Sequence, residues 1–248
     1  MRNRTSLALI IPLLIVCFVA GVLSVVLKPP TSTSIPGTST PHITIFDLPT
    51  PTRTSRSSII IFGVDSFSGS SSGTLLTTWL LSFGSKDETI ELIGIPFDAR
   101  LPDGNTLREA FSLFKPPDYG AQFIASMAVF TPYPIAGFIV LDRVGFAGLI
   151  DYLGGFTLGD QAYDGSRALV ALALLESSPQ ESLKLQSQIL QAMVLAAPAL
   201  GRTPEVTPLT TLIPEHAFSS PAAAQIATMA IPLLPINPER VEIKLWTG

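Results

Sequence analysis

The chain has 248 residues, of which 47% are hydrophobic and only 14% are charged, and its formal net charge at pH 7 is −4. This length allows one large domain or two small ones, and the charged fraction is low for a protein that lies wholly in water. The acidic balance and the lack of a run of lysines and arginines argue against nucleic acid as a partner. The sequence identifies no particular protein partner.

The hydrophobic excess is concentrated near the N-terminus. Residues 6–27 read SLALIIPLLIVCFVAGVLSVVL and carry no charge, and a helix needs about 20 such residues to cross a bilayer. Arg2 and Arg4 precede this segment, so the positive-inside rule places the N-terminus in the cytoplasm and the rest of the chain outside. We therefore expect residues 1–28 to form a cytoplasmic stub and a single-pass membrane anchor. A cleaved signal peptide is the alternative, although its apolar core is usually only about 7–15 residues long.

The position of the cysteine and the composition of residues 29–57 bear on the part of the chain that follows this segment. The only cysteine, Cys17, lies within the apolar stretch, so the exported part can form neither a disulfide nor a cysteine-based metal site. Residues 29–57 are dominated by proline, serine and threonine, a composition that buries too little surface to fold and predicts an extended extracellular spacer. Residues 58–248 are then expected to form the outer domain.

The pattern of the outer domain alternates between strands and helices. Helical spacing of apolar residues predicts a helix over 105–114, capped by Asn105 or Thr106, and another over 143–155 that ends at two glycines. The segment 164–176 is apolar nearly all round and predicts a buried helix, and Ser178 followed by proline opens the next one. Short apolar runs predict strands, the second and third as hairpin partners, over residues 58–64, 75–83, 88–95, 136–142 and 240–246. The fold class predicted is α/β, with a mixed central β-sheet flanked by helices and preceded by one transmembrane helix.

Five short motifs, in this order, resemble those of the LytR-CpsA-Psr family. They read IIIFGVDS, IPFDARL, GFIVLDRVGFAGLIDYLGG, DGSRALVAL and QSQILQAM, and the most specific part is FAGLIDYLGGFTL. The resemblance implies an α-β-α sandwich whose family members transfer a glycopolymer from a polyprenyl-pyrophosphate carrier onto peptidoglycan. It also implies a site in which Mg²⁺ and several arginines hold the pyrophosphate, and an apolar tunnel that holds the prenyl chain.

Several charged positions of the family are neutral in this chain. Phe67 stands where the family has an arginine after Asp-Ser, Phe97 replaces the arginine of a Pro-Arg-Asp motif, and Leu76 replaces a second metal-binding carboxylate. A family Arg-x-Arg pair falls at Ala173 and Leu175. The matching therefore predicts a cleft that has lost its positive charge.

Six charged or polar residues remain as candidates for the site. Asp98 and Arg100 are vestigial catalytic candidates, although an ion pair between them that fixes the loop is the structural alternative. Asp65 is a candidate metal ligand, although an aspartate that opens a serine- and glycine-rich loop is commonly a turn residue. Candidate ligand-binding residues are Arg108, Gln186 and Gln188. No cofactor is expected, and Mg²⁺ only where activity is retained.

These observations predict a membrane-anchored, extracytoplasmic LytR-CpsA-Psr-like domain of the cell envelope that has lost catalysis. Removing one preorganised charged donor typically costs about 10²–10³ in rate, and several are replaced in this chain. Such a domain would act as a binding or structural module, for a polyprenyl lipid, another apolar ligand or a cell-wall polymer. An active glycopolymer phosphotransferase and an unrelated sensory domain with the same layout are the alternatives.

Overall fold

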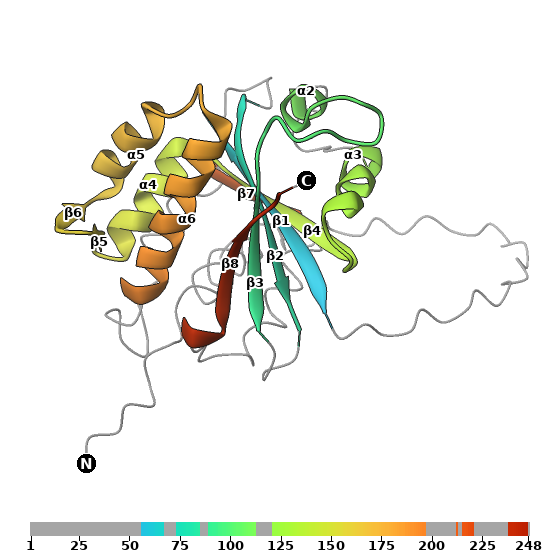
Figure 1. Cartoon of the computed structure of the whole chain (residues 1–248). Helices are drawn as coiled ribbons and strands as arrows, with labels where there is room; N and C mark the ends of the chain where they lie inside the picture. The colour runs from blue at the N-terminus through green and yellow to red at the C-terminus, as the bar shows by residue number, and fades with distance from the viewer. Residues whose placement is uncertain are drawn as a thin grey trace, which may run out of the picture.

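The structure is a computed structural model, and it describes residues 56–66, 73–84, 89–112, 121–196, 212, 215–220 and 238–247. A mixed six-stranded sheet with the strand order β7-β4-β1-β2-β3-β8 forms its centre, and helices lie on both faces (Figure 1). The predicted α/β architecture is therefore confirmed. The predicted anchor and spacer lie outside the described residues, apart from the last two residues of the spacer, and no helix within the described ranges has the length and apolar character to cross a membrane.

The strands run mostly in one direction. β1 and β4 are parallel neighbours, β2 is antiparallel to both β1 and β3, β8 is parallel to β3, and the short β7 is antiparallel to β4. The carboxyl ends of β1, β3, β4 and β8 therefore lie at the same end of the sheet. The predicted hairpin of the second and third strands is confirmed. The strand bounds are β1 Ser57–Val64, β2 Leu75–Phe83, β3 Ile90–Ile95, β4 Ile135–Leu141, β7 Ala217–Ser219 and β8 Val241–Leu245.

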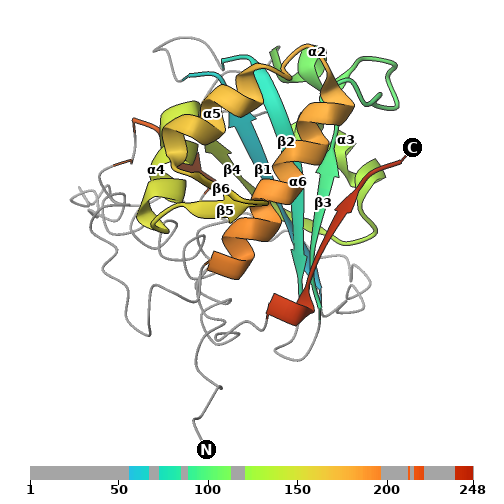
Figure 2. The same cartoon turned by 60° about the vertical axis from the view of Figure 1, so that its left-hand side comes forward.

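The sheet separates two hydrophobic cores, because successive side chains of a strand point to opposite faces. Ile59 belongs to one core and Ile60 to the other. The first core lies under α4 (Arg143–Tyr152), α5 (Gly165–Ala173) and α6 (Pro179–Ala196) (Figure 2). The second core is covered by α2 Leu107–Ser112, α3 Ala121–Ser126 and the 3-10 helix η1 Met127–Phe130.

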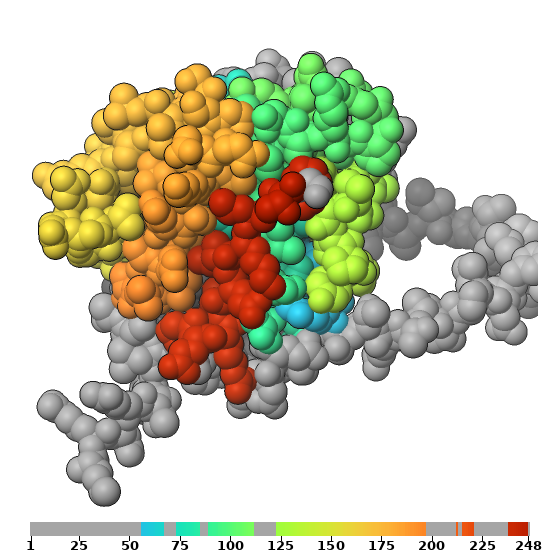
Figure 3. Space-filling model, viewed as in Figure 1, coloured from blue at the N-terminus to red at the C-terminus, as the bar shows by residue number. Residues whose placement is uncertain are grey.

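Short elements complete the domain. The hairpin of β5 (Phe156–Leu158) and β6 (Gln161–Tyr163) connects α4 to α5. The 3-10 helix η4 (Pro238–Arg240) leads into β8, which lies at the edge of the sheet between α6 and α3 (Figure 3).

Four phenylalanines form the centre of the second core. The ring of Phe62 on β1 lies 5.2 Å from that of Phe111, 5.7 Å from that of Phe123 and 6.4 Å from that of Phe138, measured between centroids. Phe111 belongs to α2 and Phe123 to α3, so this cluster holds both helices on the sheet. Aromatic pairs at such distances add to the stabilisation that burial itself provides.

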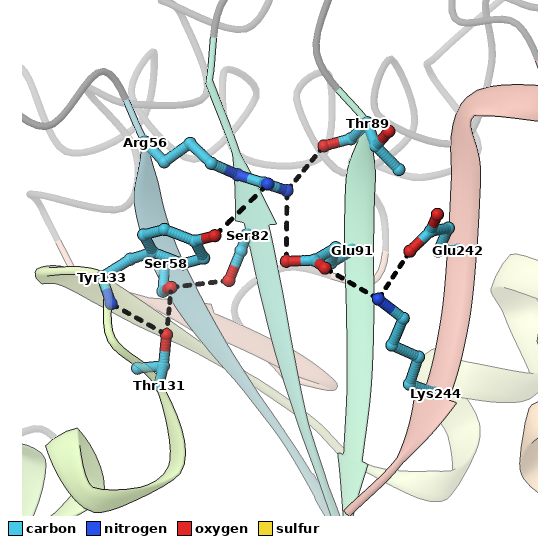
Figure 4. Close-up of polar contacts among 9 residues, drawn as sticks. All are labelled: Arg56, Ser58, Ser82, Thr89, Glu91, Thr131, Tyr133, Glu242 and Lys244. Carbon is cyan, nitrogen blue, oxygen red and sulfur yellow. Dashed lines mark hydrogen bonds and ion pairs between the residues drawn. The ribbon is translucent and has the colours of Figure 1, made fainter.

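Arg56 ties the amino end of β1 to its neighbours (Figure 4). Its guanidinium donates to the Thr89 carbonyl at 2.6 Å, lies 3.2 Å from the Glu91 carboxylate and stacks 4.8 Å from the Tyr133 ring centre. Glu91 also accepts from Lys244 on β8 at 2.9 Å. These contacts link β1, β3 and β8 at the end of the sheet where β1 and β3 begin.

The predicted end of α4 is confirmed. Gly154 and Gly155 adopt positive φ angles of 79° and 81°, and the Gly155 N–H donates to the Ile150 carbonyl at 3.0 Å. Only glycine adopts this conformation without strain, which explains the pair. Asp151, just before it, accepts a hydrogen bond of 2.7 Å from the Gly165 N–H and so fixes the start of α5.

The prediction that α5 is buried is wrong. Val170 on α5 is 63% exposed, and Leu174 at its end is 79% exposed. The helix packs on α4 and α6 rather than inside the core, and its buried positions are Gly165 and Ala168. A Cβ on Gly165 would lie 2.4 Å from the Ala147 carbonyl oxygen, so α5 docks through its smallest residues.

Candidate functional site

An apolar cavity of about 160 Å³ lies between the sheet and the helices α4, α5 and α6. The sheet contributes aromatic and aliphatic side chains to its wall, and each of the three helices contributes leucines. Six of these side chains are Ile61, Trp79, Leu92, Leu149, Leu172 and Leu190. A cavity of about 150 Å³ lined by leucine, isoleucine and phenylalanine binds benzene in another protein, so this cavity has room for an apolar group of roughly that size.

Gln186 is a polar residue in the wall of this cavity, and its hydrogen bonds are made within the protein. It is only 8% exposed. Its Oε1 accepts hydrogen bonds from Thr77 Oγ1 and, at 3.0 Å, from Trp79 Nε1, and its Nε2 donates to Ser182 Oγ at 3.1 Å. A ligand therefore needs no polar group at this depth.

Gln188, the other candidate on α6, lies outside the cavity. Two residues further along an α-helix turn the side chain by about 200°. Gln188 is accordingly exposed and lines a shallow depression beside Thr157 and Leu158 of β5. The structure therefore does not bring Gln186 and Gln188 together.

The mouth of the cavity lies at the carboxyl ends of β1 and β4. Asp142 and Arg143 follow β4, Arg108 comes from α2, and Glu176 lies in the turn between α5 and α6. Arg143 Nη2 forms an ion pair with Glu176 Oε1. In an open α/β sheet, ligands commonly bind outside the carboxyl ends of the strands.

Asp142 holds the start of α4 at the mouth. Its Oδ1 accepts from the Gly145 N–H at 2.8 Å, which makes it the N-cap residue, and its Oδ2 lies 2.8 Å from His216 Nδ1. Both carboxylate oxygens of Asp142 therefore hold the start of α4 in position. This places Arg143, the first residue of α4, at the mouth.

Arg108 is half-buried and stacks on Phe97. Its guanidinium carbon lies 3.4 Å from the Phe97 ring centre, and its Nε donates to the Leu75 carbonyl at 2.9 Å. Burial lowers the pKa of Arg108 below its usual value, while the negative charges of Glu176 and Asp98 act to raise it. Phe97, which stands at a family arginine position, thus serves as the surface on which a different arginine lies.

A capping box fixes the start of α2 just before Arg108. The Thr106 N–H donates to Glu109 Oε2 at 2.8 Å, and the Glu109 N–H donates to Thr106 Oγ1 at 3.2 Å. Of the two predicted caps, Thr106 is therefore the one used.

Asp65 fixes a loop after β1. Its Oδ1 accepts from the backbone N–H groups of Ser66 at 2.8 Å and of Thr74 at 2.7 Å. Burial acts to raise the pKa of Asp65, but these hydrogen bonds and the charge of Arg143 outweigh it, and the pKa lies below its usual value. This geometry supports the interpretation of Asp65 as a turn residue.

The described residues do not offer a suitable set of oxygen ligands for the Mg²⁺ that the resemblance implies. Mg²⁺ prefers near-octahedral oxygen ligation, whereas Leu76 stands where the resemblance implies a second carboxylate, and one oxygen of Asp65 already accepts two backbone N–H groups. Within the described ranges, no group of three or more histidine, cysteine, aspartate or glutamate side chains is placed to hold a metal ion.

The lowered pKa of Asp65 gives a pH-dependent prediction. Asp65→Asn keeps the acceptor oxygen but removes the charge, and we expect it to lower the free energy of unfolding at pH 7 by at most about 1 kcal/mol, because its partners Ser66 and Thr74 are exposed to solvent. The contribution of an aspartate with a depressed pKa is present above its ordinary pKa of 3.8 and is lost as the pH falls through the lower folded value. Urea unfolding at pH 7 and at pH 3 measures this, and a difference that grows in acid would contradict it.

The predicted ion pair between Asp98 and Arg100 is wrong. Both residues are described, and no contact within 4.0 Å joins their charged groups. Arg100 Nη1 instead donates to the Gly104 carbonyl at 2.8 Å, because the turn after β3 folds back on itself. Arg100 lies away from the cavity wall, whereas exposed Asp98 interacts electrostatically with Arg108.

The prediction of a cleft without positive charge needs correction. Arg108 and Arg143 both line the mouth, and the motif comparison had given Arg143 no role. Arg143 forms an ion pair with Glu176 and acts electrostatically on Asp65, whereas the charges of Glu176 and Asp98 act on Arg108 without forming an ion pair with it. We call these five residues the mouth charge series. Three carboxylates face two guanidinium groups, so the series carries one net negative charge.

Several solved structures share this architecture. TagV of B. subtilis superposes with a TM-score of 0.57 and 15% sequence identity, over 79% of this chain and 86% of that one. TagT bound to LIIa-WTA gives a TM-score of 0.59 at 15% identity over 79% and 80% of the two chains. Lin1025 of Listeria innocua gives 0.54 at 16% identity over 79% and 84%.

The fold is LytR-CpsA-Psr-like. TagV, TagT and Lin1025 are LytR-CpsA-Psr proteins, and the sandwich expected from the motifs is the one observed. No protein-family profile matches the sequence, and no curated protein matches it. At these identities the likeness extends to the LytR-CpsA-Psr-like fold alone, and the chemistry has to be argued from the residues of this chain.

Proposed function

We propose that this chain is a single-pass, membrane-anchored LytR-CpsA-Psr-like protein of the cell envelope whose outer domain binds an apolar ligand without transferring a glycopolymer. The ligand would be a polyprenyl lipid or another apolar molecule, and the cavity under α4, α5 and α6 would receive an apolar group of it about the size of benzene. The anchor rests on the uncharged N-terminal segment and the two arginines before it.

The observation that carries the proposal is an apolar cavity whose charged mouth is balanced by the protein itself. Arg143 forms an ion pair with Glu176, and the negative charges of Glu176 and Asp98 act on Arg108 from a greater distance. Transfer chemistry on a pyrophosphate depends on positioning and on cationic stabilisation of the developing charge. An apolar cavity is thus present, while carboxylates near its mouth offset the charge of the two arginines.

Retained glycopolymer phosphotransferase activity is the second candidate. It is favoured by the presence of Arg108 and Arg143 beside Asp98 and Asp65, the two carboxylates that match family positions. Against it stand Phe97 and Leu76, which cannot supply a cation or a metal ligand. We therefore place binding first.

A tryptophan in the cavity should block ligand binding. Leu172→Trp puts a bulky ring into the cavity wall, and we expect the full-length chain in lipid nanodiscs to bind the isoprenoid alcohol prenol at least tenfold more weakly. Ligand-detected NMR measures this binding. Leu174→Trp is the matched control, because Leu174 is 79% exposed and lies outside the cavity.

Equal weakening by both variants would contradict binding in this cavity. Unfolding curves for both proteins show whether a loss of affinity reflects a loss of folded protein. A wild-type chain that binds no prenol at all would contradict the proposed function itself.

A further inference from the structure

Glu176 occupies the central position of the mouth charge series. It pairs with Arg143 and also acts on Arg108, so one carboxylate serves both guanidinium groups. Asp65 is coupled electrostatically to Arg143, and Asp98 to Arg108. An anionic ligand head that binds Arg143 would therefore compete with Glu176 for it.

The chain holds Glu176 in this place through its backbone. After α5 the turn continues with hydrogen bonds from the Leu175 N–H to the Leu172 carbonyl at 3.0 Å and from the Ser178 N–H to the Leu175 carbonyl at 2.9 Å. Leu174 points into solvent at 79% exposure, while Glu176 lines the cavity mouth. The carboxylate is therefore part of the entrance and not a freely moving surface group.

The cavity below sets the size of the apolar part of a ligand. Its volume of about 160 Å³ is close to that of a cavity of about 150 Å³ that holds benzene, a molecule with six non-hydrogen atoms. One isoprene unit with a hydroxyl group has the same number of non-hydrogen atoms. The polar wall residue Gln186 is satisfied internally, so the buried end of the ligand is hydrocarbon.

We infer that Glu176 is a built-in counter-anion that makes this mouth select an uncharged isoprenoid alcohol over its phosphorylated form. The inference rests on the proposed function, because it assumes that the cavity binds an apolar ligand. The mouth charge series carries a net negative charge, and a diphosphate adds more negative charge to it. An uncharged hydroxyl head meets no such repulsion and leaves the Arg143–Glu176 ion pair intact.

Trp79 offers a local measurement of binding. It lines the cavity, and the only other tryptophan, Trp246, is removed as a reporter by Trp246→Phe. In this background, Trp79 emission of the full-length chain in nanodiscs is titrated with prenol and with dimethylallyl diphosphate, its phosphorylated counterpart. We expect prenol to bind at least tenfold more tightly than the diphosphate.

Glu176→Gln should change this preference selectively. Removing a negative charge a few ångströms from a polyanionic head should raise its affinity by about tenfold or more, with prenol affinity unchanged within about twofold. The side chains of the ion pair are 38% and 40% exposed, so the variant is expected to fold. Glu242→Gln is the matched control, because it removes the same charge beside Lys244, on the last strand (Figure 4).

The outcomes distinguish the counter-anion role of Glu176 from the binding function of the cavity. If prenol binds but Glu176→Gln leaves diphosphate affinity unchanged, or Glu242→Gln raises it equally, the counter-anion role is wrong and the binding function stands. If the wild-type chain prefers the diphosphate, the inference is likewise overturned. If neither compound changes Trp79 emission in wild type or in Glu176→Gln, both the inference and the proposed function fail.

Discussion

The full-length chain, given Mg²⁺ and a glycopolymer on a polyprenyl-pyrophosphate carrier, is expected to transfer the polymer at least roughly 10³-fold more slowly than an active LytR-CpsA-Psr transferase assayed beside it. One lost charged donor typically costs about 10²–10³ in rate, and losses within one site combine without simple additivity. Phe97 and Leu76 stand where the motif resemblance implies a cation and a metal ligand, and Glu176 pairs with Arg143.

Product formation on peptidoglycan, followed with a labelled glycopolymer, measures this rate. The parallel active enzyme shows that the substrate is competent, and a reaction without enzyme gives the background. Transfer within about tenfold of the active enzyme would contradict the loss of catalysis and favour the second candidate function.

Phe62→Ala should destabilise the outer domain strongly, lowering its free energy of unfolding by about 3–5 kcal/mol. Phe62 is fully buried and contacts the rings of Phe111, Phe123 and Phe138. Its removal leaves a cavity at the junction of β1, α2 and α3, and the three remaining rings cannot close it. Because α2 carries Arg108, the same variant should also loosen one side of the mouth.

Chemical denaturation followed by circular dichroism measures the free energy of unfolding. Val129→Ala is the control, because Val129 is 56% exposed and its truncation should change stability by no more than about 0.5 kcal/mol. A loss below about 1 kcal/mol for Phe62→Ala would show that the aromatic cluster does not organise the second core.

The strands and the ends of the helices could be predicted from the sequence because local signals determine them. Short apolar runs bounded by turns marked β1, β2 and β3, and the glycine pair marked the end of α4 through its positive φ angles. The burial of α5 could not be predicted in this way. Its docking depends on the contact of Gly165 with the Ala147 carbonyl on another helix, and no local pattern encodes that contact.

The candidate site was predictable only in part for the same reason. Arg108 and Gln186 were identified by motif position, and both line the cavity. Arg143 was missed because its closeness to Asp65 depends on β4 lying parallel beside β1, an order of strands that the sequence does not show. A charged pair directly after a strand, such as Asp142 and Arg143, was the signal that could have indicated it.

A crystal structure of the chain with Mg²⁺ and a prenyl diphosphate tests most directly whether the arginines at the mouth are already neutralised. Our account predicts that Arg143 stays paired with Glu176, that Arg108 stays on the Phe97 ring, and that no metal ion binds at Asp65. Density for a diphosphate held by both guanidinium groups, with Mg²⁺ on Asp65 and Glu176 turned away, would contradict it.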